Sequence, residues 1–450
     1  METPTGGNIG ARRLSAVIFA GLVAVVPLAA VPYGSVEPWW TGLFDALVFL
    51  LAALWAIEGA LAGRWLARAH LLLLPCLALA ALAFVQSAPL PGVGTVSFDP
   101  YESRLCALRL VAFTLYAAML MRYAGTERRL RALAVTVVCV GVASALFGVY
   151  RQASQHEALG FFLPLLQKGE GYAQFVSKNH FPYLAEMALG LAAGVAAGGG
   201  VSRRRLLPCA AASLLLWAAV VLSNSRGGIF AVLCQLMFLA ATFGLTRNTA
   251  RSRTAFNSFA ARVVLTLMLL AAVVVGTVWV GGDPLADRME TAREEAGRAD
   301  TVRAGRAEIW ADTWRLFERH ALLGVGLGGY WIAIRTTHGG SGMMVPRQAH
   351  NDYLELLASA GVVGALLLPA FLFLLVGRAR ERLSSGTPFT RAVCLGALAG
   401  LFGVAVHSLV DFGLHVTANA FACAALVALA AAAVARNGAE AGQKTSRREY

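Results

Sequence analysis

Long apolar stretches, separated by short polar segments, run through the chain as far as about residue 435. A helix rises about 1.5 Å per residue, so a segment that crosses a bilayer needs about 20 mostly apolar residues. The stretches that meet this criterion predict an all-α polytopic membrane protein with about twelve transmembrane helices. They cover approximately residues 14–32, 40–62, 70–88, 105–122, 132–150, 180–200, 206–222, 228–245, 263–280, 353–377, 391–410 and 414–435.

One long segment, residues 281–352, interrupts this pattern with a high density of charge. Within it Trp310, Trp314 and Phe317 follow helical spacing, which predicts an amphipathic helix with these side chains on one face. Arg306 precedes Trp310 by four residues and shares that apolar face, where an arginine needs a partner. The chain thus divides into helices 1–9 in residues 1–280, a helical loop in 281–352, helices 10–12 in 353–435, and a disordered tail in 436–450.

Basic residues occur in clusters in alternate connections, and the other short connections contain few of them. Basic loops stay in the cytoplasm, so this alternation predicts cytoplasmic chain termini and places residues 281–352 on the outer face. The net charge of +13 needs no nucleic-acid partner, because most of the charge lies in short loops beside apolar helices.

Composition agrees with a membrane protein, since 58% of the residues are hydrophobic and only 14% are charged. Soluble proteins contain about 25% charged residues. All seven cysteines lie inside apolar stretches without metal-ligand spacing, so they indicate neither disulfides nor a zinc site. The predicted outer connections also lack an Asp-X-Asp pair, and we expect neither a metal nor another cofactor.

Three arginines are candidates for binding an anion. Arg226 lies in the stretch SNSRGG (223–228), the whole connection between two predicted spans, and an arginine so close to hydrocarbon is a functional candidate. An interfacial arginine that extends to lipid headgroups is the alternative. Arg303 and Arg306 belong to the loop helix, where a salt bridge to Glu308 or Asp300 is the alternative.

A histidine, His350, lies at the predicted start of the tenth span, with Asn351 or Asp352 as the N-cap. The positive end of the helix disfavours imidazolium, so a neutral imidazole that accepts a proton is favoured. A general base at neutral pH has this property. A structural capping histidine is the alternative.

Other polar residues gather at the same predicted face. Arg347 and Lys178 could join the three arginines on a phosphate or pyrophosphate, which arginine binds bidentately. The glycine-rich stretch GVGLGG (324–329) has no preceding strand, so a turn that presents backbone N–H groups is a better interpretation than a dinucleotide site. The remaining polar candidates are His180, Glu186, Tyr353, His407, Asp411 and His415.

These motifs together resemble those of the O-antigen ligase and polymerase superfamily of bacterial envelope glycosyltransferases. The matching stretches are KNHF (178–181), SRGG (225–228), RAEIW (306–310), HALLGVGLG (320–328), HNDYLE (350–355) and HSLVDF (407–412). The resemblance implies a GT-C-like fold in the bacterial inner membrane, with the active site facing the periplasm. The catalytic candidates are Arg226, Arg306 and His350, and the substrate-binding candidates are Arg303, Arg347, Lys178, His180, Asn351, Tyr353 and Asp411.

The same resemblance implies metal-independent transfer of a glycan from undecaprenyl pyrophosphate to a hydroxyl of a periplasmic acceptor. In ligases the acceptor is a lipid A–core sugar, in polymerases a growing lipid-linked glycan, and in related transferases a protein Ser or Thr. The stretch YGSVEPWW (33–40) is not a feature of the best-known ligases, which leaves the acceptor open. The expected partners are the lipid-linked donor, lipid A–core or another glycan, and membrane lipid, but no nucleic acid. A lipid or glycan transporter is the competing class, although the polar residues gather at one face and the halves show no repeat.

Overall fold

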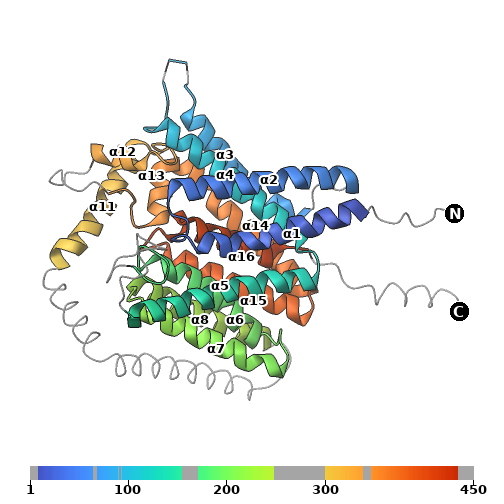
Figure 1. Cartoon of the computed structure of the whole chain (residues 1–450). Coiled ribbons are helices and arrows are strands. Elements are labelled where there is room, and N and C mark those ends of the chain that lie inside the picture. Colours follow the sequence, from blue (N-terminus) through green and yellow to red (C-terminus); the bar gives the residue numbers. More distant parts are fainter. Residues whose placement is uncertain are drawn as a thin grey trace.

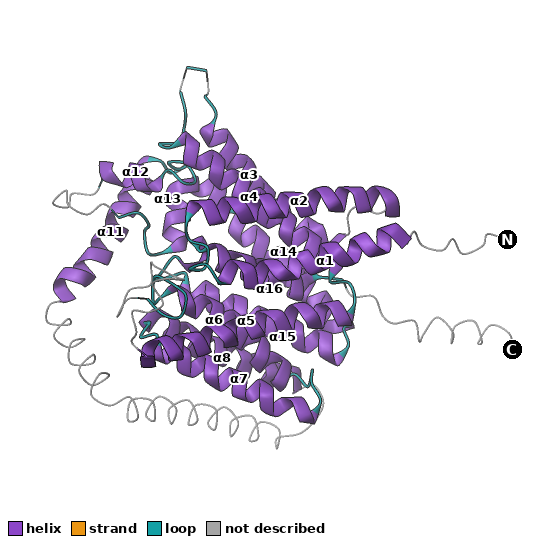
Figure 2. Cartoon of the chain, in the orientation of Figure 1, coloured by secondary structure: helices purple, strands orange, loops and turns teal. Residues whose placement is uncertain are grey.

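The computed structural model describes residues 9–63, 68–89, 91–92, 94–154, 171–247, 299–337 and 346–433. These residues form a helical bundle without strands (Figure 1, Figure 2). The α-helices are α1 (Ile9–Ala30), α2 (Pro38–Ala62), α3 (Leu74–Ser87), α4 (Pro100–Tyr123), α5 (Glu127–Ser154), α6 (His180–Ala197), α7 (Arg203–Leu222), α8 (Arg226–Arg247), α11 (Ala299–Arg319), α12 (Tyr330–Ala333), α13 (Asp352–Ala365), α14 (Leu367–Ser385), α15 (Pro388–His407) and α16 (Thr417–Ala431). Short 3-10 helices are η1 (Arg68–Leu73), η3 (Ile334–Thr336) and η4 (Gly413–His415).

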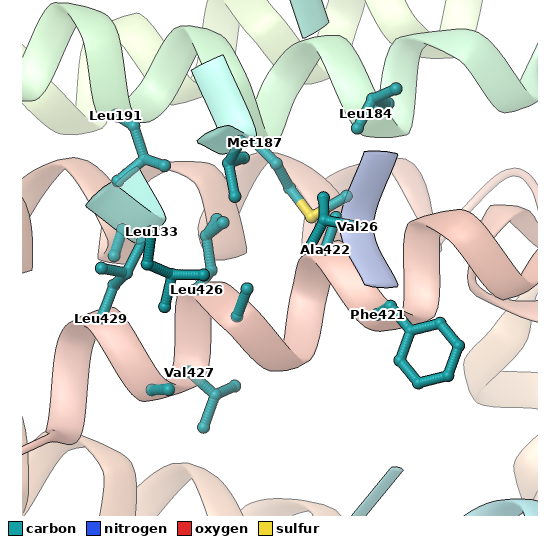
Figure 3. Packing of buried hydrophobic residues seen from close by; sticks show 14 of the residues in the cluster. Val26, Leu133, Leu184, Met187, Leu191, Phe421, Ala422, Leu426, Val427 and Leu429 are labelled. Atoms are coloured by element: carbon teal, nitrogen blue, oxygen red, sulfur yellow. The ribbon is translucent and has the colours of Figure 1, made fainter. Parts of the chain in front are cut away.

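Helix α6 lies in the middle of the main core, packed against α5, α7, α8 and α15. Every residue from His180 to Ala192 is buried. Glycines allow α15 to approach closely, since a Cβ on Gly194 would lie only 2.3 Å from the Cα of Gly396. Close contacts between small residues are the usual basis of helix packing in lipid. Figure 3 shows side chains of α1, α5, α6 and α16 meeting in this core.

Several helices have the length and composition of membrane spans. In the described part of the chain seven helices qualify, and α13 with α14 makes an eighth if this bent pair counts as one span. Residues Arg226–Thr242 and Thr417–Ala431 are shorter apolar helices. The prediction of an all-α polytopic membrane protein is therefore confirmed. The predicted span 263–280 lies outside the described residues, and the number of twelve spans stays a prediction.

The span predicted over residues 353–377 is bent, because α13 and α14 meet at an angle of 71°. Within α13, Gly361 has a φ of 63° and a ψ of −171°, a backbone conformation that other residues rarely adopt. A Cβ on Gly361 would lie 2.3 Å from the carbonyl oxygen of Leu322. The helix is therefore interrupted where it packs against the segment that follows α11.

Arg129, Arg131, Arg205 and Arg382 lie at one end of the bundle, which we term the arginine end. There Arg129 donates a hydrogen bond to Ser15 of α1 at 3.1 Å, and Arg382 donates to the carbonyl of Ala432, next to the last residue of α16. The start of α1 and the end of α16 thus lie at the same end of the bundle (Figure 1). The starts of α6, α8 and α13 lie at the opposite end, which we term the motif end.

Helix α11 lies beside the motif end and packs against α13 (Figure 1). Its buried face contains Asp312 and Thr313, and the Thr313 hydroxyl lies 2.7 Å from the hydroxyl of Tyr330. Trp314 and Phe317 lie on one side of this helix, with ring centroids 5.2 Å apart, but Trp314 is 48% exposed. The polar contacts with the following segment, which periodicity does not reveal, set the orientation of this helix.

Candidate functional site

The backbone of His350 is strained and held in place by its neighbours. Its φ of 51° lies in the left-handed region, which costs a residue other than glycine on the order of 1–3 kcal/mol. The N–H of Ala349 donates to Oε2 of Glu355 at 2.7 Å, and the carbonyl of Ala349 accepts from Nε1 of Trp310 at 2.9 Å. Each bond contributes about 0.5–1.5 kcal/mol. Together they offset the strain and hold the backbone next to His350 in place.

The residues after His350 begin α13 and join it to α15. Oδ1 of Asn351 accepts hydrogen bonds from the N–H groups of Tyr353 and Leu354 at 3.1 and 3.0 Å, so Asn351 is the N-cap. The hydroxyl of Tyr353 donates to the carbonyl of Ala405 in α15 at 2.6 Å. Both of these substrate-binding candidates therefore use polar atoms to hold the start of the helix.

Three imidazoles surround the ring of Phe412 in the connection between α15 and α16. The ring centroid of Phe412 lies 4.8 Å from that of His350, 5.1 Å from His180 and 5.9 Å from His415. All three meet it edge to face, a geometry that ring pairs prefer. We term His180, His350, Asp411, Phe412 and His415 the Phe412 cluster. Phe412 ends the HSLVDF stretch, but sequence reasoning gave it no role in the site, and its position next to Asp411 was the available signal.

Asp411 supplies the negative charge of the Phe412 cluster. Its Oδ1 lies 3.7 Å from Nδ1 of His350, an ion-pair distance too long for a hydrogen bond, and accepts from the N–H of Phe412 at 2.9 Å. Burial raises the pKa of Asp411, but His350, this N–H and His180 outweigh burial and hold the pKa below its usual value. The Asp411 side chain is 4% exposed and that of His350 is 34% exposed. A carboxylate thus lies behind a histidine that reaches the surface.

Two carboxylates of α13 hold His415. Its Nε2 lies 3.4 Å from Oδ1 of Asp352 and 3.8 Å from Oε1 of Glu355. Burial lowers the pKa of His415, but the two carboxylates outweigh burial and raise it to about 9. Sequence reasoning named His415 without these partners. The i, i+3 spacing of Asp352 and Glu355 on one helix was the signal that could have indicated them.

A fully buried pair lies beneath the Phe412 cluster. Nδ1 of His407, the last residue of α15, lies 2.8 Å from Oε1 of Glu186 in α6, and both side chains are 0% exposed. The ring of Tyr183 stacks on His407 with centroids 4.2 Å apart, and Gln235 of α8 donates to the carbonyl of Glu186 at 2.7 Å. The sequence placed Glu186 and His407 on separate spans, and the fold brings them together.

The SRGG turn begins α8 directly beside this buried pair. A Cβ on Gly227 would lie 3.0 Å from Nε2 of His407, and a Cβ on Gly228 would lie 2.5 Å from Cβ of Pro182. The two glycines therefore let α8 pack closely against α15 and α6. Asn224, two residues before Arg226, has a φ of 54° and is a second strained position at this end.

Arg226 is the first residue of α8, and its side chain is exposed. Among the described residues it has no hydrogen-bond or ion-pair partner. The start of a helix carries free N–H groups and partial positive charge, so it attracts anions. An arginine at this position adds to that attraction and favours a phosphate.

Of the other four predicted cations, two have side chains in the described part of the chain. Lys178 and Arg347 are exposed and form no hydrogen bond or ion pair within the described ranges. Arg303 and Arg306 lie in α11, about two turns and one turn before Trp310, but their side chains lie outside the described part. The convergence of Arg306 with Arg226 stays a prediction.

The prediction that the glycine-rich stretch 324–329 presents N–H groups to a ligand is wrong. The N–H of Val325 donates to the carbonyl of Ala358 at 3.0 Å, and the N–H of Leu327 donates to Oε1 of Gln86 at 3.0 Å. Both N–H groups are therefore hydrogen-bonded within the protein. The stretch is a turn that docks the loop onto α3 and α13.

The motif end combines groups that can accept a proton and bind an anion. An imidazole with a carboxylate behind one nitrogen has the geometry of a general base. An exposed arginine at a helix start suits a phosphate group. In the described part of the chain, no three His, Cys, Asp or Glu side chains are arranged to hold a metal ion.

Part of this site lies in a region that matches a known protein family. A family model described as O-antigen ligase matches residues 211–369, from α7 into α14. No curated protein matches the chain. The matched segment contains Arg226, Arg306 and His350, whereas His180 and Asp411 lie outside it. The match of residues 211–369 supports the resemblance to the O-antigen ligase superfamily that the sequence motifs indicate.

Proposed function

We propose that the protein is an O-antigen ligase-type glycosyltransferase, which moves a glycan from undecaprenyl pyrophosphate to a hydroxyl of a lipid A–core sugar in a metal-independent reaction. The observation that carries this proposal is His350, strained at a φ of 51° and 3.7 Å from Asp411, at the end of the bundle where Arg226 is exposed. Strained polar residues that the surrounding structure holds in place gather at functional sites.

In this reaction the acceptor hydroxyl attacks the anomeric carbon of the donor, and His350 takes the hydroxyl proton. The bond between that carbon and the pyrophosphate oxygen breaks, and undecaprenyl pyrophosphate leaves with the electron pair. Arg226 and Arg306 bind the pyrophosphate and stabilise the charge that develops on it. A single displacement of this kind inverts the anomeric centre.

Asp411 has a positioning role in this scheme. It faces Nδ1 of His350, which leaves Nε2 for the acceptor hydroxyl. A buried carboxylate beside an imidazole orients the ring and stabilises the imidazolium that forms. The side chain of His350 is 34% exposed, so an acceptor can reach it.

The remaining candidates divide into two groups. Lys178, Arg303 and Arg347 carry charge that suits contacts with the anionic donor. The second group, His180, Asn351 and Tyr353, supports the base. His180 packs on Phe412, and the polar atoms of Asn351 and Tyr353 form hydrogen bonds within the fold.

The proposed location is the bacterial inner membrane. With the arginine end in the cytoplasm, the starts of α6, α8 and α13 face the periplasm, where lipid-linked glycans are used. Both chain termini are then cytoplasmic. The contacts of Arg129 with Ser15 and of Arg382 with Ala432 support this orientation. They place basic residues beside both the start of α1 and the end of α16.

Two other functions remain candidates. A polymerase of the same superfamily would use the same groups and differ in its acceptor, a growing lipid-linked glycan. A lipid or glycan transporter is favoured by one observation, the buried pair of Glu186 and His407, because ionisable groups inside a membrane bundle often mark a proton or ion path.

The test is the release of undecaprenyl pyrophosphate by the purified protein. With a lipid-linked glycan and lipid A–core present, we expect release that depends on the acceptor and is lost in His350→Ala. Release that needs a second lipid-linked glycan instead would identify a polymerase. Movement of intact lipid-linked glycan across proteoliposomes, with no release, would contradict the enzyme and identify a transporter.

A further inference from the structure

An open groove lies between α5, α6, α7 and the start of α15. It contains about 660 Å³ of empty space, counting the space at its open side. Val138 and Cys139 of α5 and Leu191 and Val195 of α6 are among the side chains that line its apolar walls. The groove thus has the lining of a site for a hydrocarbon chain.

Two arginines, Arg131 of α5 and Arg205 of α7, line the same groove. Both side chains are exposed, and neither forms an ion pair with a described residue. The guanidinium of Arg131 lies 4.6 Å above the ring of Phe389, which holds it at the groove. Arg131 and Cys139 are eight residues apart on one helix, so the apolar wall extends about 12 Å from the charged end.

The electrostatics of this end call for an anion. Helix α7 begins with three arginines, has no acidic residue in its first turn, and its N-cap Ser202 makes no capping hydrogen bond. Helices α5 and α15 also begin here, and a helix start carries partial positive charge. The one acid in the first turn of α5, Glu127, accepts a hydrogen bond from Thr387. Cations at helix starts are unfavourable unless an anion neutralises them.

We propose that this groove binds an anionic phospholipid, with its phosphate between Arg131 and Arg205 and one acyl chain along the apolar wall. The site pairs charge with hydrocarbon, as such a lipid does. Basic pockets between membrane helices bind anionic headgroups in this way.

The groove is separate from the site proposed for glycan transfer. Helix α6 begins with His180 in the Phe412 cluster, and it ends at Ala197, beside the groove. Its 18 residues make a helix about 27 Å long. The lipid of this groove therefore lies at the arginine end, far from the bound pyrophosphate of the donor. The proposal does not depend on the enzymatic one.

The experiment titrates the full-length protein in detergent with dioleoyl phosphatidylglycerol or dioleoyl phosphatidylcholine and follows the thermal midpoint, which rises when a lipid binds the folded state. Phosphatidylglycerol is expected to raise the midpoint at lower concentrations than phosphatidylcholine. The double substitution Arg131→Gln with Arg205→Gln should weaken the apparent affinity for phosphatidylglycerol about tenfold or more.

The matched control is Arg128→Gln with Arg204→Gln, which removes the same charge from the same helices. Both control residues are exposed and lie outside the groove lining. The site predicts less than about a threefold change in the control. An equal loss in both double variants would overturn the proposal, because it would indicate general attraction to a basic surface.

A second variant tests the apolar wall. Cys139 lines the groove and is exposed, so Cys139→Trp fills the groove without removing charge. It should weaken phosphatidylglycerol binding about as much as the loss of both groove arginines. Unchanged binding in Cys139→Trp would overturn the proposal, since the acyl chain would then lie elsewhere.

Discussion

Two helix starts at the motif end, those of α13 and α8, are built in opposite ways. The start of α13 is closed, because both backbone groups of Ala349 are hydrogen-bonded and Asn351 caps the helix. At the start of α8 the Ser225 hydroxyl accepts a hydrogen bond from the N–H of Gly228 at 3.3 Å. We nevertheless call this start open, because the guanidinium of Arg226 is exposed and has no partner among the described residues. One end of the molecule thus holds a fixed histidine and an available arginine.

This difference matches two chemical requirements. A general base must point in one direction, because proton transfer depends on alignment with the acceptor. A residue that binds phosphate must keep its donors available until the anion arrives. The closed start suits the base and the open start suits the anion, which is the division of roles proposed for glycan transfer.

The largest effect is expected at the open start. Arg226→Ala should lower kcat/KM about 10²–10³-fold, because the charge on the leaving pyrophosphate loses a donor. Arg226→Lys should recover only a small part of this loss, since lysine cannot bind bidentately. Arg319→Lys, at the exposed end of α11, is the control and should change kcat/KM less than about threefold. Full activity in Arg226→Lys would contradict bidentate binding.

The closed start is tested by loosening it without removing the base. Trp310→Phe keeps the ring but removes the hydrogen bond to Ala349, and we expect kcat to fall about tenfold with little change in KM. Trp314→Phe, one turn later, is the control, because its Nε1 donates only to Glu318 at the surface. Equal rates in the two variants would show that the hydrogen bond to Ala349 does not position His350.

A smaller effect, on stability, is expected where α8 packs against α15. Gly227→Ala places a methyl group about 3.0 Å from His407 and should lower stability by roughly 1–3 kcal/mol. Gly42→Ala in α2 is the control, because its Cβ would meet no atom within 4 Å. That change should raise the thermal midpoint slightly. A thermal midpoint for Gly227→Ala at or above wild type would contradict the close packing of α8 against α15.

The smallest effect is a pH dependence at His415, next to the closed start. The carboxylates raise the pKa of His415 to about 9, above the value of 6.5 for an unfolded histidine. The ion pairs of His415 therefore stabilise the fold fully below pH 6.5, and this stabilisation is lost as the pH rises through 9. The thermal midpoint of His415→Gln should therefore lie below wild type at pH 6 and approach it near pH 10. A difference that does not change with pH would contradict the ion pairs with Asp352 and Glu355.

The sequence predicted the helical fold and the segments that carry the candidate site, because apolar stretches and motifs are local features. It could not predict contacts between distant segments. Glu186 and His407 are 221 residues apart, and only the packing of α6 on α15 joins them. The break at Gly361 depends on Leu322, and the Phe412 cluster draws its imidazoles from three segments. Helical periodicity likewise could not show that contacts bury Asp312 and leave Trp314 exposed.

The most direct test of the account is His350→Gly, with turnover and thermal midpoint measured on the same preparation. Glycine adopts a φ of 51° without strain, so the midpoint should stay equal to wild type or rise. Turnover should fall about 10²–10⁴-fold, the usual contribution of a general base. This combination would separate the catalytic role of the imidazole from the structural role of its backbone. Turnover close to wild type in a stable His350→Gly protein would contradict the assignment of His350 as the base.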